Sequence, residues 1–484
     1  MSDTITPTRA ANFIAGEWRP SRSGNTYERR SPWRPSDVVG EFPSSSAEDV
    51  HDAADAADQA AKQWAKLPAA RRGAILTRAA ELIEARVYEI ARDMTREMGK
   101  PLRESRGEAA RAAQILRFFG SEGWRELGKM FEQSATGATV YTRRRPLGVV
   151  GLITPWNFPA AIPAWKTAPA LAYGNTVVLK LAQDAPLTGL HLARAFADAE
   201  LPKGVLNVVI GRGSEVGEPL IADLRIRAIS FTGSVLVGHG VRDLAAGLGK
   251  RVQLELGGHN PLIVAQDADL DRAVQAAFAG AFWSAGQKCT ATRRIYVHDA
   301  LYESFRERLT QRISAAKVGD PTHPETEVGP LVNKSQFEEV LLGIARGREE
   351  GGTVLTGGER AHDEAYLIAP TVFENVGDDD FLSCEEVFGP VTSLYRFHTL
   401  EEAIERANRP RFGLSAAVFT DSLATAQRCV DDLEAGILHV NSQTAGADVH
   451  VPFGGTKESG YGPHEQGRAA IEFYTEEITV YQDA

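Results

Sequence analysis

The chain has 484 residues, of which 43% are hydrophobic and 24% are charged, proportions typical of globular proteins that bury a sizeable core. This length predicts two or three domains. With 53 basic and 64 acidic residues the formal net charge is −11, which argues against nucleic acid or an anionic membrane surface as the main partner.

The cysteine content indicates a reducing compartment. Cys289, Cys384 and Cys429 lie far apart and are odd in number, which fits neither a disulfide framework nor a metal-ligand cluster. The first residues lack the basic and apolar pattern of a signal peptide, and every apolar stretch is too short to span a membrane. We therefore expect a cytoplasmic protein.

The N-terminal third is predicted to be an arm followed by helices. The first fifty residues are rich in Gly, Pro, Ser and Arg and predict an arm packed on a larger body. Three Ala-rich helices are expected at 47–66, 70–99 and 102–119. Gly99 and Pro101 should end the second of them, because proline cannot continue a helix and glycine tolerates a left-handed cap.

From Leu147 onward, short apolar runs alternate with amphipathic segments. Strands are predicted at 149–153, 176–179, 205–210 and 228–231, each followed by a helix, near 160–171, 186–200, 214–221 and 235–246. Such alternation predicts a parallel sheet covered on both faces. A second series runs from 261–264 to about Val440 with no flexible linker before it, so two α/β bodies should pack directly around a ligand cleft.

Two segments belong to neither series. Residues 121–145 and the C-terminal piece 478–481 carry β-forming side chains. Either could pair at an exposed sheet edge, which suggests oligomerisation.

Cys289 is the first candidate for chemistry. It lies in Gly286-Gln-Lys-Cys-Thr290, after an apolar helix at about 269–283 and before a strand at 294–297. A thiol in a loop beside a lysine and backbone amides can have its pKa lowered and act as a nucleophile. The alternative is a small, inert buried residue.

Four further clusters punctuate the chain: Thr154-Pro-Trp-Asn-Phe-Pro159, Glu255-Leu-Gly-Gly-His-Asn-Pro261, Glu385-Glu-Val-Phe-Gly-Pro390 and Val451-Pro-Phe-Gly-Gly-Thr-Lys457. Singly, each indicates a turn with a packed ring. The first follows a predicted strand, where ligands gather in open α/β sheets. In this order and spacing, together with Cys289, they make the chain resemble the aldehyde dehydrogenase superfamily from about Phe13 to Tyr481.

The resemblance implies an α/β fold with two doubly wound parallel-sheet domains and a small β oligomerisation element. Residues 1–120 and 146–256 would form a dinucleotide-binding domain, 257–463 a catalytic domain, and 121–145 with 464–484 the oligomerisation element. A homodimer or homotetramer is expected.

The resemblance also implies catalytic roles. Cys289 matches the nucleophile, Glu255 the general base, and Asn157 the amide that forms an oxyanion hole with the Cys289 backbone N–H. Lys166 matches a lysine close to the catalytic pathway, although a surface or structural role is the alternative. The chemistry agrees, because thiolate addition creates an oxyanion, hydride must leave, and the resulting thioester needs water and a base. No metal is required.

NAD or NADP is the implied cofactor. The loop 211–217 follows a predicted strand but is one residue too long for G-x-G-x-x-G. The resemblance places it near the adenosine and the pyrophosphate at Phe231-Thr-Gly-Ser234, where a helix begins. Lys180 would bind the adenosine ribose, and Glu386 with Phe388 the nicotinamide ribose. The full expected cofactor set is Thr154, Pro155, Trp156, Lys180, Gln183, Gly213, Phe231, Gly233, Ser234, Gly257, Glu386 and Phe388.

Gln183 departs from the family pattern. Relatives that prefer NAD often carry a glutamate there, which binds the ribose hydroxyls and repels a 2′-phosphate. Because glutamine removes this repulsion, we expect NADP to be accepted.

The substrate residues are expected at a tunnel mouth formed by Phe158, Trp165, Trp283 and Phe453, rings that could equally fill a core. The segments 444–455, 461–468 and 472–475 are similar to the 2-oxoglutarate semialdehyde dehydrogenase branch, as is Cys289-Thr-Ala291. A distal carboxylate would favour a nearby arginine. Arg111 is the candidate, with a solvated helix arginine as the alternative.

Other functions stay open at this point. Aromatic or aliphatic aldehydes, of the benzaldehyde, vanillin or betaine aldehyde kind, are alternative substrates. CoA-acylating relatives tend to lack the glutamate that Glu255 supplies, so hydrolysis is favoured. A non-enzymatic protein on this fold would have no reason to keep Cys289, Glu255 and Asn157 together. A P-loop enzyme would need G-x-x-x-x-G-K-[ST], which the sequence lacks.

Overall fold

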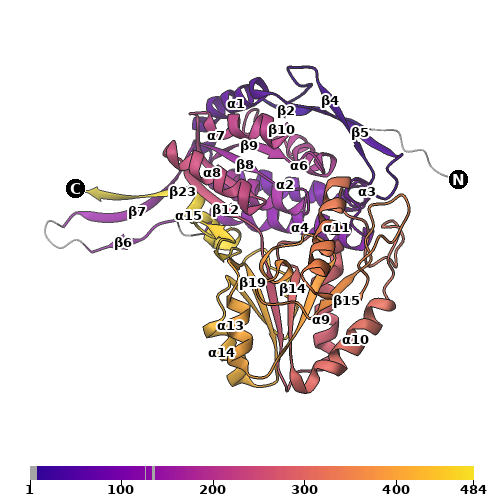
Figure 1. Cartoon of the computed structure of the whole chain (residues 1–484). Helices are drawn as coiled ribbons and strands as arrows, with labels where there is room; N and C mark the ends of the chain where they lie inside the picture. The colour runs from indigo at the N-terminus through magenta and orange to yellow at the C-terminus, as the bar shows by residue number, and fades with distance from the viewer. Residues whose placement is uncertain (1–7, 126, 133–136, 484) are drawn as a thin grey trace.

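A computed structural model describes residues 8–125, 127–132 and 137–483. Two α/β bodies lie one above the other in Figure 1, and a thin β arm projects from their side. No helix in the described residues combines the length and the apolar character needed to cross a membrane.

The N-terminal segment forms two small β pieces and four helices. β1 (Thr8–Arg9), β4 (Thr26–Arg30) and β5 (Val38–Pro43) make a three-stranded sheet, and β2 (Asn12–Ile14) and β3 (Glu17–Arg19) join a larger one. The helices are α1 (Ala47–Lys66), α2 (Ala69–Ala85), α3 (Val87–Met98) and α4 (Leu102–Gly120). The single helix predicted at 70–99 is therefore wrong, because the backbone of Arg86 leaves helical geometry (φ −110°, ψ 10°) between α2 and α3.

The first large sheet has the strand order β22-β12-β11-β8-β9-β10-β2-β3. Its central strands are parallel: β8 (Val149–Ile153), β9 (Thr176–Leu181), β10 (Leu206–Ile210), β11 (Ile226–Thr232) and β12 (Arg251–Glu255). Both faces are buried, since Val177 and Leu179 pack in one hydrophobic cluster and Val178 packs in another. This two-sided burial explains the continuous apolar runs in the sequence.

Helices cover both faces of this sheet. They are α1 together with α5 (Ala161–Ala172), α6 (Pro186–Asp198), α7 (Glu218–Ala222) and α8 (Val235–Gly247), while α2 packs on α4, α5 and α6. The helix predicted near 214–221 is instead a π-type turn, Gly213–Gly217, followed by the short α7.

The second body is built on a seven-stranded sheet with the order β15-β16-β17-β14-β13-β19-β20. Its strands are β13 (Asn260–Val264), β14 (Thr292–His298), β15 (Thr353–Thr356), β16 (Thr371–Glu374), β17 (Val391–Phe397), β19 (Ser415–Phe419) and β20 (Ile437–Val440). Six helices accompany them: α9 (Leu270–Phe282), α10 (Tyr302–Ser314), α11 (Lys334–Glu349), α12 (Phe381–Cys384), α13 (Leu400–Asn408) and α14 (Leu423–Asp432). β18 (Phe412–Gly413) pairs with β21 (Thr456–Lys457).

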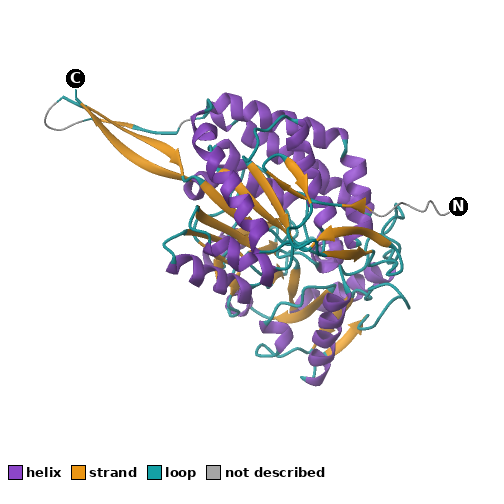
Figure 2. Cartoon of the chain, turned by 90° about the horizontal axis from the view of Figure 1, so that it is seen from above, coloured by secondary structure: helices purple, strands orange, loops and turns teal. Residues whose placement is uncertain are grey.

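The projecting arm joins the two segments that the sequence left outside both series. β6 (Met130–Phe131), β7 (Thr139–Pro146) and β23 (Thr475–Gln482) form an antiparallel sheet that extends away from the bodies in Figure 2. Part of 121–145 lies outside the described residues. A short helix, α15 (Ala470–Tyr474), precedes β23. The division into domains stays a prediction, and β22 (Gly460–Tyr461), from the range assigned to the catalytic domain, pairs with β12 of the first sheet.

Candidate active site

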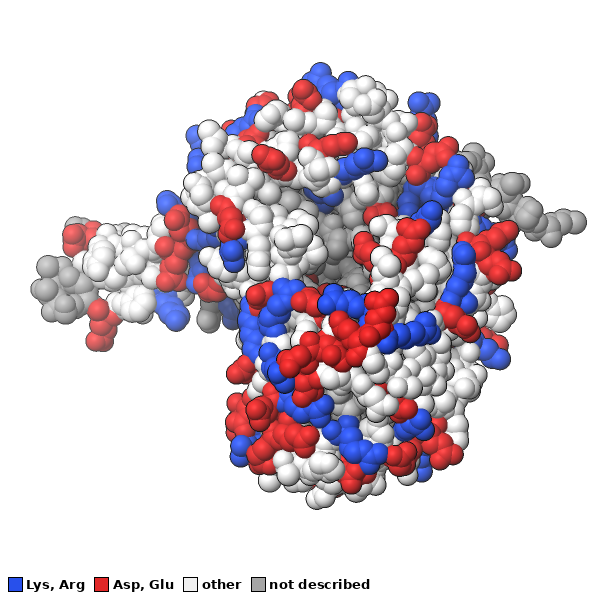
Figure 3. All heavy atoms as spheres, in the orientation of Figure 1, with Lys and Arg blue, Asp and Glu red and all other residues white. Residues whose placement is uncertain are grey.

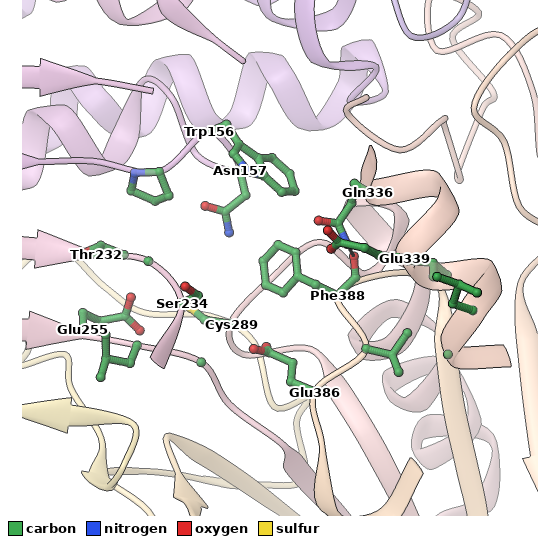
Figure 4. Close-up of a pocket in the computed structure, with 18 of the residues that line it drawn as sticks. Trp156, Asn157, Thr232, Ser234, Glu255, Cys289, Gln336, Glu339, Glu386 and Phe388 are labelled. Atoms are coloured by element: carbon green, nitrogen blue, oxygen red, sulfur yellow. Dashed lines mark hydrogen bonds between the residues drawn. The ribbon is translucent and has the colours of Figure 1, made fainter. Parts of the chain in front are cut away.

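A cavity of about 590 Å³ lies between the two bodies, and Figure 3 shows the surface hollowed there. It is found where β8, β11 and β12 end, the usual ligand position in parallel sheets, and α11 closes its other side. Its lining consists of Pro155, Trp156, Asn157, Ile162, Thr232, Gly233, Ser234, Glu255, Leu256, Gly257, Cys289, Gln336, Glu339, Val340, Leu342, Gly343, Arg346, Phe381, Glu386, Val387 and Phe388. The predicted nucleophile, base and amide are therefore brought to one space (Figure 4).

The loop that carries Cys289 has a strained backbone. Ser284 (φ 57°) and Ala285 (φ 52°) both adopt the left-handed conformation that non-glycine residues rarely adopt. Gly286 follows with φ 68°, and a Cβ there would overlap the Gly389 carbonyl. Glu104 of α4 holds the loop by accepting hydrogen bonds from the Ser284 N–H (3.2 Å) and Oγ (2.6 Å). The surrounding structure thus fixes the position of the thiol.

The pKa of the Cys289 thiol is shifted in the direction opposite to the sequence-based expectation. Burial raises this pKa well above its usual value, and the nearby carboxyl groups of Glu255 and Glu386 raise it further. Lys288 does not offset this, because its buried ammonium donates to the Ala279 carbonyl (3.0 Å) and burial lowers its own pKa to about 8. The free thiol therefore needs a base.

Glu255 brings a buried carboxyl group to the same cavity. It ends β12, is 1% exposed, and neither of its carboxylate oxygens has an ordinary hydrogen-bond partner among the described residues. Burial raises its pKa well above the usual value; the charge of Glu465 raises it further, whereas Lys166 and the Cys289 thiol lower it. A carboxylate with a raised pKa can take a proton at neutral pH.

Behind Glu255 lies a buried ion pair between Lys166 and Glu465. Lys166 is 1% exposed, which excludes the surface role, and its Nζ also donates to Ser230 Oγ (2.7 Å). Ser230 Oγ in turn donates to Gln253 Oε1 (2.9 Å). Sequence reasoning missed Glu465, whose position in the range 464–484 was predicted to serve oligomerisation.

Asn157 is held firmly in the loop after β8. Its Nδ2 donates to the Gln287 carbonyl (3.1 Å), which uses one of its two hydrogens. Its backbone carbonyl accepts from Lys100 Nζ (2.8 Å), and Lys100 pairs with Glu108. The remaining amide hydrogen is available for an oxyanion near Cys289.

Seven of the predicted cofactor residues line the cavity: Pro155, Trp156, Gly233, Ser234, Gly257, Glu386 and Phe388. The rings of Trp156 and Phe388 meet edge to face with centroids 5.5 Å apart. Burial raises the pKa of Glu386 to about 7, against the opposing charge of Arg293. A Cβ at Gly257 would overlap the Glu386 carboxylate. Any larger residue at this position would therefore displace that carboxylate.

The other five are not among the described residues that line the cavity. Thr154, which follows β8, and Phe231 of β11 are buried, and Lys180 is near the end of β9 with its pKa lowered to about 8, mainly by burial. Gln183 follows β9, and its carbonyl accepts from the Tyr27 hydroxyl (2.9 Å). Gly213 opens the π-type turn.

One wall of the cavity was missed entirely by sequence reasoning. α11 contributes Gln336, Glu339 and Arg346, and α12 contributes Phe381. The sequence carried no signal for this wall beyond an ordinary amphipathic pattern.

The predicted substrate residues lie around α4 and α5, apart from the described residues that line this cavity. Trp165 packs on Phe453 with ring centroids 5.5 Å apart. Lys100 Nζ lies 4.0 Å from the centre of the Phe158 ring, and Arg103 5.1 Å from that of Trp283. Arg111 donates from Nη2 to Gln466 Oε1 (3.4 Å).

Comparisons with known proteins agree with this geometry. Residues 18–480 match the model described as "Aldehyde dehydrogenase family". The chain is 44% identical to the alpha-ketoglutaric semialdehyde dehydrogenase of Bacillus subtilis, over 97% of both chains. It is 37% identical to an aldehyde dehydrogenase from Bacillus cereus solved with NAD+ (TM-score 0.96, 98% of this chain and 97% of that one). It is 36% identical to an E. coli NADP-dependent enzyme (TM-score 0.96, 98% of both).

Proposed function

Since this chain belongs to the aldehyde dehydrogenase family, whose members oxidise aldehydes with NAD(P), we propose that it forms a carboxylic acid from an aldehyde with Cys289 as nucleophile, Glu255 as base and Asn157 as oxyanion donor. The observation that carries this assignment is the shared cavity, into which all three side chains project (Figure 4). The family and the α/β fold predicted from the sequence are confirmed.

The residues present fit a nicotinamide dinucleotide. The Glu386 carboxylate, which packs against Gly257 and lines the cavity, can accept hydrogen bonds from the hydroxyls of a ribose. The exposed Ser234 is the N-cap residue of α8, where free N–H groups and the helix dipole favour phosphate. The rings of Trp156 and Phe388 also line the cavity. When bound, the cofactor accepts the hydride that leaves the aldehyde carbon.

The side chains of the protein transfer the protons and stabilise the charged groups that form. Glu255 takes the proton of the Cys289 thiol, because its carboxylate is hydrogen-bonded to the sulfur and its own raised pKa favours holding a proton. The Asn157 amide and the Cys289 backbone N–H stabilise the oxyanion that forms when sulfur adds to the carbonyl. Glu255 then releases the thiol proton to solvent, so that after the thioester has formed its carboxylate takes a proton from the hydrolytic water. Lys166 stabilises the ionised form of Glu255 from behind.

We expect NADP to be accepted, because the Gln183 side chain carries no charge that repels a 2′-phosphate. The neighbouring Asp184 is engaged by Asn333 Nδ2 (2.9 Å) and Arg29 (3.6 Å). Values of kcat/KM with both cofactors test this, and Gln183→Glu should lower the value for NADP relative to NAD by at least about tenfold. A wild-type preference for NAD above about 100-fold, about 2.7 kcal/mol, counts against it.

The substrate we propose is a short aldehyde with a distal carboxylate, such as 2-oxoglutarate semialdehyde. Similarity over nearly the whole length to a relative named for that activity supports it. A screen of semialdehyde acids, benzaldehydes and betaine aldehyde, with product analysis in the presence and absence of CoA, separates this substrate class from the alternatives.

We also propose a homodimer or homotetramer built through the arm. Its tip exposes Met130 (78%), Phe131 (51%) and Tyr481 (70%), and edge strands offer unpaired backbone groups. Changing Met130 and Phe131 to lysine should shift the mass measured by light scattering toward that of one chain. Leu423→Lys, at a leucine 84% exposed on α14, is the control. A double variant with the wild-type mass would contradict this role of the arm.

A further inference from the structure

Two loops that contribute to the cavity lining are in direct backbone contact. The thiol loop, residues 284–291, carries the nucleophile, and the cofactor loop, residues 385–390, carries the carboxylate assigned to the ribose. A Cβ on Gly286 of the thiol loop would lie 2.1 Å from the carbonyl oxygen of Gly389 in the cofactor loop. Because the two backbones leave no room for a side chain there, the position of one loop constrains the position of the other.

Arg293 joins these two loops through hydrogen bonds. It is the second residue of β14 and is 3% exposed. Its Nη2 donates to the Gly286 carbonyl (2.5 Å), and its Nη1 donates to the carbonyls of Gly389 (2.6 Å) and of Val391 (3.4 Å), which begins β17. The Gly286 carbonyl also accepts from the Lys288 N–H (2.9 Å). The guanidinium therefore bonds directly to the turn that presents the thiol.

The guanidinium also supplies positive charge to both loops. Burial lowers the pKa of Arg293 to about 10, while the charges of Glu386 and Cys289 oppose that shift, so the group stays charged at neutral pH. Burial raises the pKa of Glu386 to about 7, and the charge of Arg293 is the strongest effect in the opposite direction. Loss of this charge would therefore raise the pKa of Glu386 further. A protonated carboxyl has less capacity to accept hydrogen bonds from ribose hydroxyls.

We propose that Arg293 is a positioning residue that locks the thiol loop and the cofactor loop together, so that the nucleophilic sulfur and the bound cofactor keep one fixed separation. The proposal rests on the function proposed above. Arg293 is not among the described residues that line the cavity, so it acts through the two loops and not on substrate or cofactor directly. Hydride transfer needs a reactive geometry accurate to about 1 Å, and the separation of these loops sets that geometry.

Arg293→Met and Arg293→Lys separate the hydrogen bonds from the charge. Methionine removes both, whereas lysine keeps the charge but lacks the planar fork that reaches three carbonyl groups. With 5-oxopentanoate as the aldehyde, both variants should lower kcat by at least about tenfold, because a displacement of about 1 Å between reacting groups can cost about 100-fold. KM for the aldehyde should change by less than about threefold. Kd for NAD, measured by calorimetry, should rise by at least about threefold.

The pH dependence of cofactor binding is the readout that a purely structural role would not change. In the wild type, Kd for NAD should fall as pH rises through about 7, where Glu386 becomes ionised. In Arg293→Met this transition should move at least about 0.5 pH unit higher, because the opposing charge is gone. In Arg293→Lys it should stay within about 0.3 pH unit of the wild-type position, while kcat remains low.

Arg294→Lys is the matched control. Arg294 is the next residue of β14, is 1% exposed, and donates to the carbonyls of His259 (2.7 Å), Arg406 (3.0 Å) and Ala407 (3.0 Å), none of which belongs to either loop. Its replacement removes a comparable set of buried hydrogen bonds, so Tm should fall about as much as in Arg293→Lys. Both kcat and Kd for NAD should change by less than about threefold.

Equal losses of kcat in Arg293→Lys and Arg294→Lys would overturn the proposal, as would a wild-type pH transition in Arg293→Met. If Arg293→Met does not fold, the comparison of the two lysine variants decides alone. An Arg293→Lys protein with wild-type kcat overturns the positioning role and leaves aldehyde oxidation standing. A wild type that binds NAD but oxidises none of the aldehydes in the screen above overturns the proposed function, and the positioning role with it.

Discussion

Replacing Cys289 with serine is expected to lower kcat for aldehyde oxidation by about 10⁴-fold or more. The thiol already needs Glu255 to remove its proton, because burial and two carboxyl groups raise its pKa. A serine hydroxyl is several pKa units harder to ionise, and the same base cannot deprotonate it. Formation of NAD(P)H, followed by absorbance with excess aldehyde, measures the loss.

Two controls distinguish loss of the nucleophile from loss of the fold. The substitution is nearly isosteric, so Tm should stay within a few degrees of the wild-type value. Cys384→Ser is the matched control: this half-buried thiol donates to the Asp378 carbonyl (3.5 Å) and belongs to α12 of the second body. It should keep nearly full activity. A Cys289→Ser protein with the parent's rate would remove the basis of the mechanism.

The strands could be predicted well because burial on both faces of a sheet requires a continuous apolar run, which is visible in the sequence. The runs at 149–153, 176–179 and 228–231 lie in β8, β9 and β11, whose residues are buried on both faces of the sheet. Such strands need continuous apolar side chains. The break at Arg86 left no mark, because neither glycine nor proline is present there and the apolar periodicity continues.

The candidate site was predictable where chemistry dictates a residue type and not where only position matters. Cys289, Glu255 and Asn157 belong to distinctive sequence clusters, and the structure puts them around one cavity. The wall formed by α11 has an ordinary amphipathic sequence, which tells which face is buried but not what it faces. The direction of the Cys289 pKa shift also could not be predicted, because it depends on burial and on carboxyl groups distant in sequence.

Replacing Glu255 with glutamine is expected to lower kcat by about 10²- to 10⁴-fold, the usual contribution of a general base. The amide keeps the shape of the side chain but cannot accept the proton of the Cys289 thiol or of the hydrolytic water. In the wild type, activity should fall on the acidic side as Glu255 becomes protonated, at a pH well above the usual value for glutamate, since burial raises this pKa. A pH profile of kcat/KM for wild type and variant measures both effects.

Stability provides the control, and its sign follows from the same pKa shift. A carboxyl group whose pKa is raised in the folded state favours folding only while it is protonated. Its contribution to the free energy of unfolding is fully present at low pH and is lost as pH rises through the folded-state pKa. Glu255→Gln should therefore have a higher Tm than the wild type at about pH 8, with the difference vanishing near about pH 4. An inactive variant that is more stable at alkaline pH cannot owe its inactivity to unfolding. A variant that is less stable there would show that the buried carboxylate is satisfied by partners and is not held as a base.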